Sequence, residues 1–132
     1  MESTGGTEWQ PLPGATTNIK VPTGTTATID ARFTAQSACY SLEIVVSDSW
    51  CSVRILIDST EGQPAAGHDF VFDTTNNGAE TSDDWEAHAI ERFVTGVGPG
   101  AHTVTVQMAA NKNAVTFAID DWSLVVEAFR TS

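Results

Sequence analysis

The stretch TATIDARFTA, residues 26–35, indicates the structural class of this chain. Apolar and polar side chains alternate along it without a break. Successive side chains of a β-strand point to opposite faces of a sheet, so alternation makes one face apolar and the other polar. The stretch therefore predicts a strand that packs one face against a core and turns the other to solvent. The apolar set is Ala27, Ile29, Ala31 and Phe33.

Similar segments follow along the rest of the chain. Turn signals rich in glycine, proline or asparagine lie between them. WEAHAIERF, residues 85–93, has some helical propensity, but its surroundings are strand-like and we expect a strand. No helical period persists, and about eight strands at this spacing predict an all-β fold, an antiparallel β-sandwich of the jelly-roll type. Besides residues 26–35, the expected strands are 16–21, 42–46, 51–58, 68–73, 85–93, 101–109 and 114–129.

The length of 132 residues suits a single domain. Residues 1–15 contain several glycines and prolines, so we expect an irregular N-terminal arm. The jelly-roll domain is expected at residues 16–132. Trp9 is unusual for a free arm, and we expect it to dock on the body of the domain or on a neighbouring subunit.

The charge balance excludes several classes of partner. The formal net charge is −11, and the six lysines and arginines are scattered singly between Lys20 and Arg130. Binding to nucleic acid requires clustered basic residues, so we expect none. No apolar run approaches the roughly 20 residues of a membrane-spanning helix, so membrane insertion is not expected.

The N-terminal stretch MESTGGTEWQPLPG lacks the basic and apolar regions of a signal peptide. We nevertheless expect an extracellular or virion-associated location. Such a location would be reached after removal of a signal, or by another route such as lysis of a phage host.

Two cysteines, Cys39 and Cys51, flank the stretch YSLEIVVSDSW. In a threonine-rich, lysine-poor chain they favour one disulfide between neighbouring strands, with two unpaired thiols as the alternative. A disulfide would stabilise the fold by roughly 3 kcal/mol in the chain-entropy model. It would also imply an oxidising environment.

The sequence motifs argue against catalysis. A G-x-S-x-G nucleophile elbow is absent, and GVGPG lacks the lysine of a phosphate-binding loop. The histidines, His68, His88 and His102, are too far apart in sequence to form a local metal-binding pair, and we expect structural roles for them. We therefore expect no enzyme, no cofactor and no dedicated metal site.

A weak calcium candidate remains in the loop before residue 85. Calcium takes six to eight oxygen ligands, and Asp83, Asp84 and Glu80 could provide some of them, helped by Asn76 and Asn77. The spacing of an EF-hand is absent. A solvated acidic loop is the alternative interpretation.

Carbohydrate binding is a further hypothesis. Sandwich domains that bind sugars expose two or three aromatic rings for stacking, and Trp50, Tyr40 and Trp85 are the candidates. The alternative is that these rings anchor the core or an interface, because a sandwich of this size needs about this many large rings.

The stretch AIDDWSLVVE, residues 118–127, first suggests a pair of catalytic acids. Neighbouring residues of a strand face opposite sides, so Asp120 and Asp121 cannot converge on one bond. The apolar residues before them are also out of phase with Trp122, Leu124 and Val126. We therefore predict a β-bulge at Asp120–Asp121, with Trp122 near the core and the acids accepting backbone N–H bonds. A cation site is the alternative.

The C-terminal half resembles a known group of domains. GPGAHTVTVQ followed by TFAIDDWSLVVE is similar to the C-terminal jelly-roll domains of bacterial and phage secreted or tail-associated proteins. SACYSLEIVVSDSWCSVRILID and HDFVFDTT extend the resemblance to about residues 17–130. More distantly, the layout is similar to the C1q and tumour-necrosis-factor class, which assembles as trimers. The resemblance implies an architecture and says little about a ligand.

Several segments are apolar on both faces, which the resemblance would explain. Leu56, Val71 and Val125 each lie between two other apolar residues. One sandwich buries only one face of each sheet, and a large exposed apolar patch is rare on monomers. We therefore expect a non-catalytic structural or interaction module that forms a homo-oligomer, in this class a homotrimer. The alternative is a carbohydrate-binding module with glycan partners.

Overall fold

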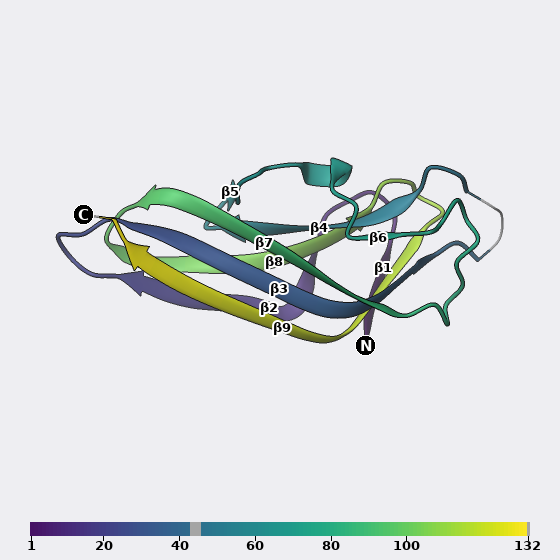
Figure 1. Cartoon of the computed structure of the whole chain (residues 1–132), viewed down its shortest axis with the longest axis horizontal. Coiled ribbons are helices and arrows are strands. Elements are labelled where there is room, and N and C mark those ends of the chain that lie inside the picture. Colours follow the sequence, from purple (N-terminus) through teal and green to yellow (C-terminus); the bar gives the residue numbers. More distant parts are fainter. Residues whose placement is uncertain (43–45, 132) are drawn as a thin grey trace.

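The computed structural model describes residues 1–42 and 46–131. These residues form nine strands and one short 3₁₀ helix (Figure 1). No helix among them is long and apolar enough to cross a membrane. The elements are β1 (Glu2–Gly5), β2 (Gln10–Val21), β3 (Ala27–Tyr40), β4 (Trp50–Ile57), β5 (Thr60–Glu61), η1 (Gly67–Asp69), β6 (Asp73–Thr74), β7 (Glu86–Val97), β8 (Gly100–Ala110) and β9 (Thr116–Arg130).

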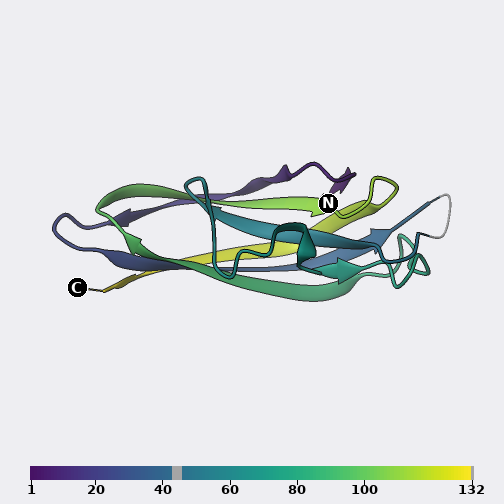
Figure 2. The same cartoon turned by 90° about the horizontal axis from the view of Figure 1, so that it is seen from above.

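The strands form two packed sheets, which Figure 2 shows edge-on. Sheet A has the order β1-β9-β3-β7, and sheet B has the order β2-β8-β4-β5 with β6 also paired to β4. All pairs are antiparallel. Each long strand, from β2 to β3, β4, β7, β8 and β9, lies in the opposite sheet from the one before it. The predicted antiparallel β-sandwich is confirmed.

The core fills the space between the sheets with the residues that alternation assigned to it. On β3, Ile29 and Phe33 are fully buried, while their neighbours face outward. The ring of Phe33 lies 6.0 Å from that of Phe72 and 6.1 Å from that of Trp122, between centroids. Sheet B contributes Ile55 and other aliphatic residues from β4 and β8.

The predicted bulge in β9 is confirmed. Ser123 pairs with Thr34, but the next pair along β3 joins Gln36 to Asp120, so β9 has an extra residue there. Asp121 adopts a φ of +48°, and its N–H donates to Asp120 Oδ1 at 3.0 Å. This shift turns Trp122 toward the core, where it is half-buried.

The prediction of an irregular arm at residues 1–15 was wrong. Residues 2–5 form β1, where Gly5 pairs with Thr116 of β9, and β2 already begins at Gln10. The register of β2 shifts between Pro11 and Thr16. The glycines and prolines of this segment suggested an irregular conformation. Edge strands and irregular pairings tolerate both residue types, so their presence did not exclude strands here. The irregular segment of β2 also contributes to the core, because Leu12 and Ala15 are buried.

Trp9 docks on the body of its own domain, as one of the two expectations had it. The guanidinium of Arg54 lies 4.4 Å from the centre of the Trp9 ring, and the ring of His68 lies 4.5 Å from it. Both partners belong to the sheet B side of the sandwich.

The expected strand at residues 68–73 is largely absent. Residues Gly67–Asp69 form the 3₁₀ helix η1, and only Asp73 of this segment enters a strand, β6. The side chain of Ser52 accounts for part of this difference, because its hydroxyl lies within hydrogen-bonding distance of the carbonyl oxygens of His68, at 3.1 Å, and Phe70, at 2.6 Å. The expected strand at 42–46 falls partly on residues 43–45, which lie outside the described residues.

The disulfide between Cys39 and Cys51 is confirmed, with a Cα–Cα distance of 6.0 Å. Its position differs from the prediction, because β3 and β4 lie in different sheets and are not neighbours within one. The bond therefore ties sheet A to sheet B, and both cysteines are fully buried.

Candidate functional site

The inner face of β7 carries ionisable residues where the other strands carry aliphatic ones. Alternation along β7 turns one set of side chains to the inner side, namely Glu86, His88, Ile90 and Arg92. The residues between them, such as Ala87, face the outer side. Of the inward set, Ile90 is buried and His88 is half-buried. An edge strand with a partly polar inner face leaves room for a polar site between the sheets.

Asp73 of β6 faces this part of β7 from sheet B. It is 2% exposed, and its Oδ2 accepts a 2.7 Å hydrogen bond from the hydroxyl of Ser37, which is itself fully buried. Burial raises the pKa of the Asp73 carboxyl, while the Ser37 hydrogen bond and the charge of His88 act against this rise. Asp73 pairs with Cys51, so the interior carboxylate lies beside the disulfide.

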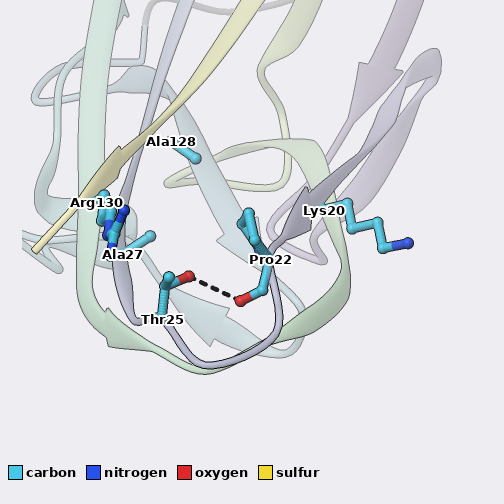
Figure 3. Close-up of a pocket in the computed structure, with 6 residues that line it drawn as sticks. All are labelled: Lys20, Pro22, Thr25, Ala27, Ala128 and Arg130. Carbon is cyan, nitrogen blue, oxygen red and sulfur yellow. Dashed lines mark hydrogen bonds between the residues drawn. The ribbon is translucent and has the colours of Figure 1, made fainter. Parts of the chain in front are cut away.

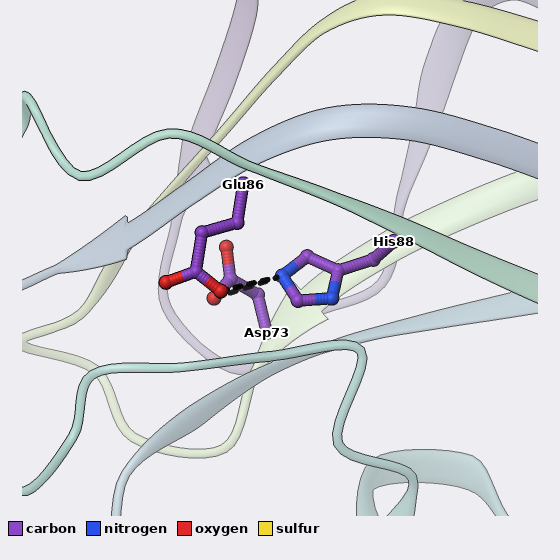
Figure 4. A group of neighbouring side chains, drawn as sticks. All are labelled: Asp73, Glu86 and His88. Carbon is purple, nitrogen blue, oxygen red and sulfur yellow. Dashed lines mark ion pairs between the residues drawn. The ribbon is translucent and has the colours of Figure 1, made fainter.

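Three side chains converge where β6 meets the start of β7 (Figure 4). His88 Nε2 lies 3.6 Å from Asp73 Oδ1 and 3.5 Å from Glu86 Oε2. One ligand atom from each of the three lies within 4.8 Å of the others. Charge-assisted hydrogen bonds are shorter, about 2.7–2.9 Å. We call this group the Asp73–Glu86–His88 cluster.

His88 differs from the other two histidines in what its ring nitrogens contact. His102 has Nδ1 at 2.8 Å from Asp58 Oδ2 and Nε2 at 2.7 Å from the Gly98 carbonyl. His68 Nε2 lies 2.8 Å from the carbonyl of Thr7. By contrast, His88 Nε2 is shielded from solvent and has no hydrogen-bond partner among the described residues. An unpartnered buried polar atom is rare in native proteins and needs an explanation.

The surroundings of the cluster are apolar on one side and open on the other. The rings of Phe72 and His88 pack in a T-shaped arrangement, with 5.5 Å between their centroids. Ala35 pairs with His88 on β3, and its small side chain leaves space for the imidazole. The Glu86 side chain is 56% exposed, whereas that of Asp73 is 1% exposed. The cluster can therefore be reached from solvent past Glu86.

Sequence reasoning expected a structural role for His88 and missed the cluster. Asp73 comes from the other sheet, and the alternation within one strand contains no information on contacts across the sandwich. Glu86 and His88, two residues apart on the buried face, were the signal that could have pointed to it.

The calcium candidates of the acidic loop occupy separate positions. Asp84 Oδ2 accepts the N–H of Thr81 at 2.6 Å, and Asp83 is exposed. Burial raises the pKa of Glu80, and the charges of Asp84, Glu86 and Asp73 raise it further. Within the described residues, Asp83, Asp84 and Glu80 do not form a set of converging ligand atoms. Calcium binding by this loop stays a prediction.

The candidate sugar-stacking rings, Tyr40, Trp50 and Trp85, are all half-buried. They lie at the end of β3, at the start of β4 and just before β7. The indole N–H of Trp50 donates to the His68 carbonyl at 2.7 Å. In the described part of the chain, no ring contact joins any two of the three. Sugar stacking by these rings stays a prediction.

The exterior of sheet A carries three exposed large apolar side chains. Val125 is 46% exposed, Phe129 is 51% exposed and Phe93 of β7 is 41% exposed. Charged residues of β3, β7 and β9 lie between them, including an ion pair from Arg32 to Glu127. We call these residues, together with Asp30 and Glu91, the outer face of sheet A.

Asp30 gives this face a pH dependence that can be measured. Its pKa is raised from 3.8 to about 6, first by burial and then by the hydrogen bond and charge of Glu91, with Arg32 acting in the opposite direction. The folded chain thus binds this proton more tightly than the unfolded chain. The stabilisation is fully present below pH 3.8 and is lost as the pH rises through about 6.

We expect the side-chain carboxyl carbon of Asp30 to titrate in NMR with a midpoint near 6. Glu91→Gln should move this midpoint back toward the ordinary value of 3.8. Asp30→Asn should make the chain more stable at neutral pH and flatten the stability profile between pH 3.8 and about 6. A midpoint near 4 in the wild-type chain would contradict the expectation.

A pocket of about 350 Å³ lies at the end of the sandwich where β2 turns into β3 and β9 ends (Figure 3). Thr25 Oγ1 donates to the Pro22 carbonyl at 2.7 Å, and the amine of Lys20 points away from the other labelled side chains. The lining residues therefore lack the convergent polar groups that orient a ligand. They are Lys20, Pro22, Thr25, Ala27, Ala128 and Arg130.

Among the described residues, two features are therefore candidates for a function, because packing of the fold does not account for them. They are the Asp73–Glu86–His88 cluster and the outer face of sheet A. The first lies between the sheets and the second on the exterior. Comparison of the chain with protein-family models, with curated proteins and with solved structures finds no match in any of the three.

Proposed function

We propose that this chain is a non-catalytic structural or interaction module that assembles with copies of itself through the outer face of sheet A. The observation that carries the proposal is the exposure of Val125, Phe129 and Phe93 on one side of a sheet whose other side is already packed. Exposed apolar groups on a common face mark interaction surfaces. A neighbouring copy packed on this face would remove them from water.

The charges of the outer face of sheet A also favour contacts between copies of the chain. The chain as a whole is strongly acidic, at −11, so two randomly chosen surfaces repel each other. The outer face has both signs, because Arg32 lies among Glu127, Asp30 and Glu91. In a ring of three copies each contact joins two different patches of neighbouring chains, and a face that carries both signs can supply opposite charges to such a contact.

The resemblance to trimeric jelly rolls supports a homotrimer, and the resemblance to secreted and tail-associated domains supports an extracellular or virion-associated setting. The Cys39–Cys51 disulfide is compatible with such a setting, because disulfides persist in oxidising environments.

Sedimentation velocity and light scattering from micromolar to submillimolar concentration would test assembly. We expect a species of three times the 14.0 kDa chain mass. The double variant Val125→Thr, Phe129→Thr should shift it to monomer, because it removes apolar area from the contact. Val71→Thr is the matched control, since Val71 is 48% exposed but lies outside sheet A.

A wild-type chain that stays monomeric over this range would contradict the proposal, as would a Val71→Thr variant that dissociates as readily as the double variant. Glycan binding is the second candidate, supported by the partial exposure of Tyr40 and Trp85. A monomer whose tryptophan fluorescence responds to a glycan, and loses the response in Trp85→Ala, would favour it.

A further inference from the structure

We propose that Asp73, Glu86 and His88 bind one divalent transition-metal ion of the zinc type, and that this ion links the two sheets of the sandwich. Asp73 comes from β6 of sheet B, whereas Glu86 and His88 come from β7 of sheet A. The proposal is independent of self-assembly, because the cluster lies between the sheets.

The distances fit a shared ion better than direct bonding. His88 Nε2 lies 3.5 and 3.6 Å from the two carboxylate oxygens. In a tetrahedral zinc site with metal–ligand distances of about 2.1 Å, neighbouring ligand atoms are about 3.4 Å apart. A direct ion pair between imidazolium and carboxylate would bring nitrogen and oxygen to about 2.7–2.9 Å. His88 Nε2 is thus at the separation of ligands around a common centre from each of the two carboxylate oxygens.

The unpartnered nitrogen is a second, independent observation. His88 Nε2 is shielded from solvent and has no hydrogen-bond partner among the described residues. A buried polar atom without a partner destabilises the folded chain. A metal bound by its lone pair removes this cost. The Phe72 ring packed against the imidazole and the small Ala35 beside it hold the ring in place.

The charge and the hydrogen bonds of the cluster are also those of a metal site. Two carboxylates and a neutral imidazole balance the charge of a divalent cation. Asp73 is 2% exposed, and a buried carboxylate is costly unless it is paired or coordinates a metal. The hydroxyl of Ser37 donates to its Oδ2 and leaves Oδ1 directed at His88. Outer hydrogen bonds of this kind orient metal ligands.

The donor set selects the class of ion. Calcium and magnesium prefer oxygen ligands alone, whereas imidazole combined with carboxylates suits zinc and other first-row transition metals. Solvent reaches the cluster past Glu86, so water can supply a fourth ligand.

Zinc titration of the chelator-treated full chain, by calorimetry and by competition with a chromogenic chelator, tests the proposal. We expect one ion per chain with micromolar or tighter affinity, and a melting temperature several degrees higher with zinc. Ser37→Ala should weaken binding by about 10- to 100-fold, and Glu86→Gln and His88→Gln should weaken it further. Glu86 is a safe position for folding, because its side chain is 56% exposed.

Two controls match these variants. Glu91→Gln changes the same residue type on the opposite face of β7, and His68→Gln removes a histidine whose Nε2 contacts a carbonyl. Both should bind zinc like the wild-type chain. The proposal is overturned if the wild-type chain shows no micromolar zinc binding, if Glu86→Gln and His88→Gln bind as the controls do, or if calcium binds as tightly as zinc.

Discussion

Replacing Phe33 by alanine is expected to lower the free energy of unfolding by about 3 to 5 kcal/mol, the typical cost of removing a buried aromatic ring. Phe33 is fully buried in the middle of β3. Its ring contacts those of Phe72 and Trp122, at 6.0 and 6.1 Å between centroids. The substitution leaves a cavity lined from both sheets, and strands paired on both sides of β3 cannot move to fill it.

Urea unfolding at a low protein concentration would measure this effect. Phe129→Ala is the matched control, because it removes the same side chain from a position that is 51% exposed. Its cost should be about 1 kcal/mol or less, as is usual for surface sites. Equal losses in the two variants would mean that the core does not depend on the ring of Phe33.

Loss of the Cys39–Cys51 disulfide is expected to cost roughly 3 kcal/mol. The bond closes a loop between residues 12 apart in sequence, and its removal gives the unfolded chain more conformational freedom. In the folded chain it also joins β3 of sheet A to β4 of sheet B. The variant with both cysteines replaced by alanine should therefore melt at a clearly lower temperature.

The matched comparison is the wild-type chain unfolded with and without a reducing agent. The reduced wild-type chain and the double alanine variant should agree to within about 1 kcal/mol, since both lack the cross-link. A stability unchanged by reduction, in a sample whose mass confirms that the bond is broken, would contradict the prediction.

The sequence predicted those parts of the fold that depend on local alternation. The apolar residues of the stretch 26–35 are buried in β3, and the disulfide lies between the two cysteines expected to form it. The bulge in β9 could also be predicted, because Ile119 and Trp122 cannot both face the core in an unbroken strand. In each case the information lies within a few consecutive residues.

The features that could not be predicted depend on contacts between distant residues. Leu12 and Ala15 enter the core only because β2 pairs irregularly with β8. Asp73 meets His88 only because β6 and β7 lie on opposite sides of the sandwich. The order of strands in the sheets determines these contacts, and no local pattern encodes that order.

The alternation of successive long strands between the sheets has a kinetic consequence. Among the described strands, no long strand is hydrogen-bonded to the long strand next to it in sequence. Ser37 pairs with Glu86, and Gly5 pairs with Thr116, so the long strands do not find their partners through local hairpins. Each such distant pairing costs loop-closure entropy before its contacts form. We therefore expect folding to take roughly milliseconds to seconds. The disulfide keeps the end of β3 near the start of β4. We therefore expect the oxidised chain to fold faster than the reduced one, which stopped-flow refolding would measure.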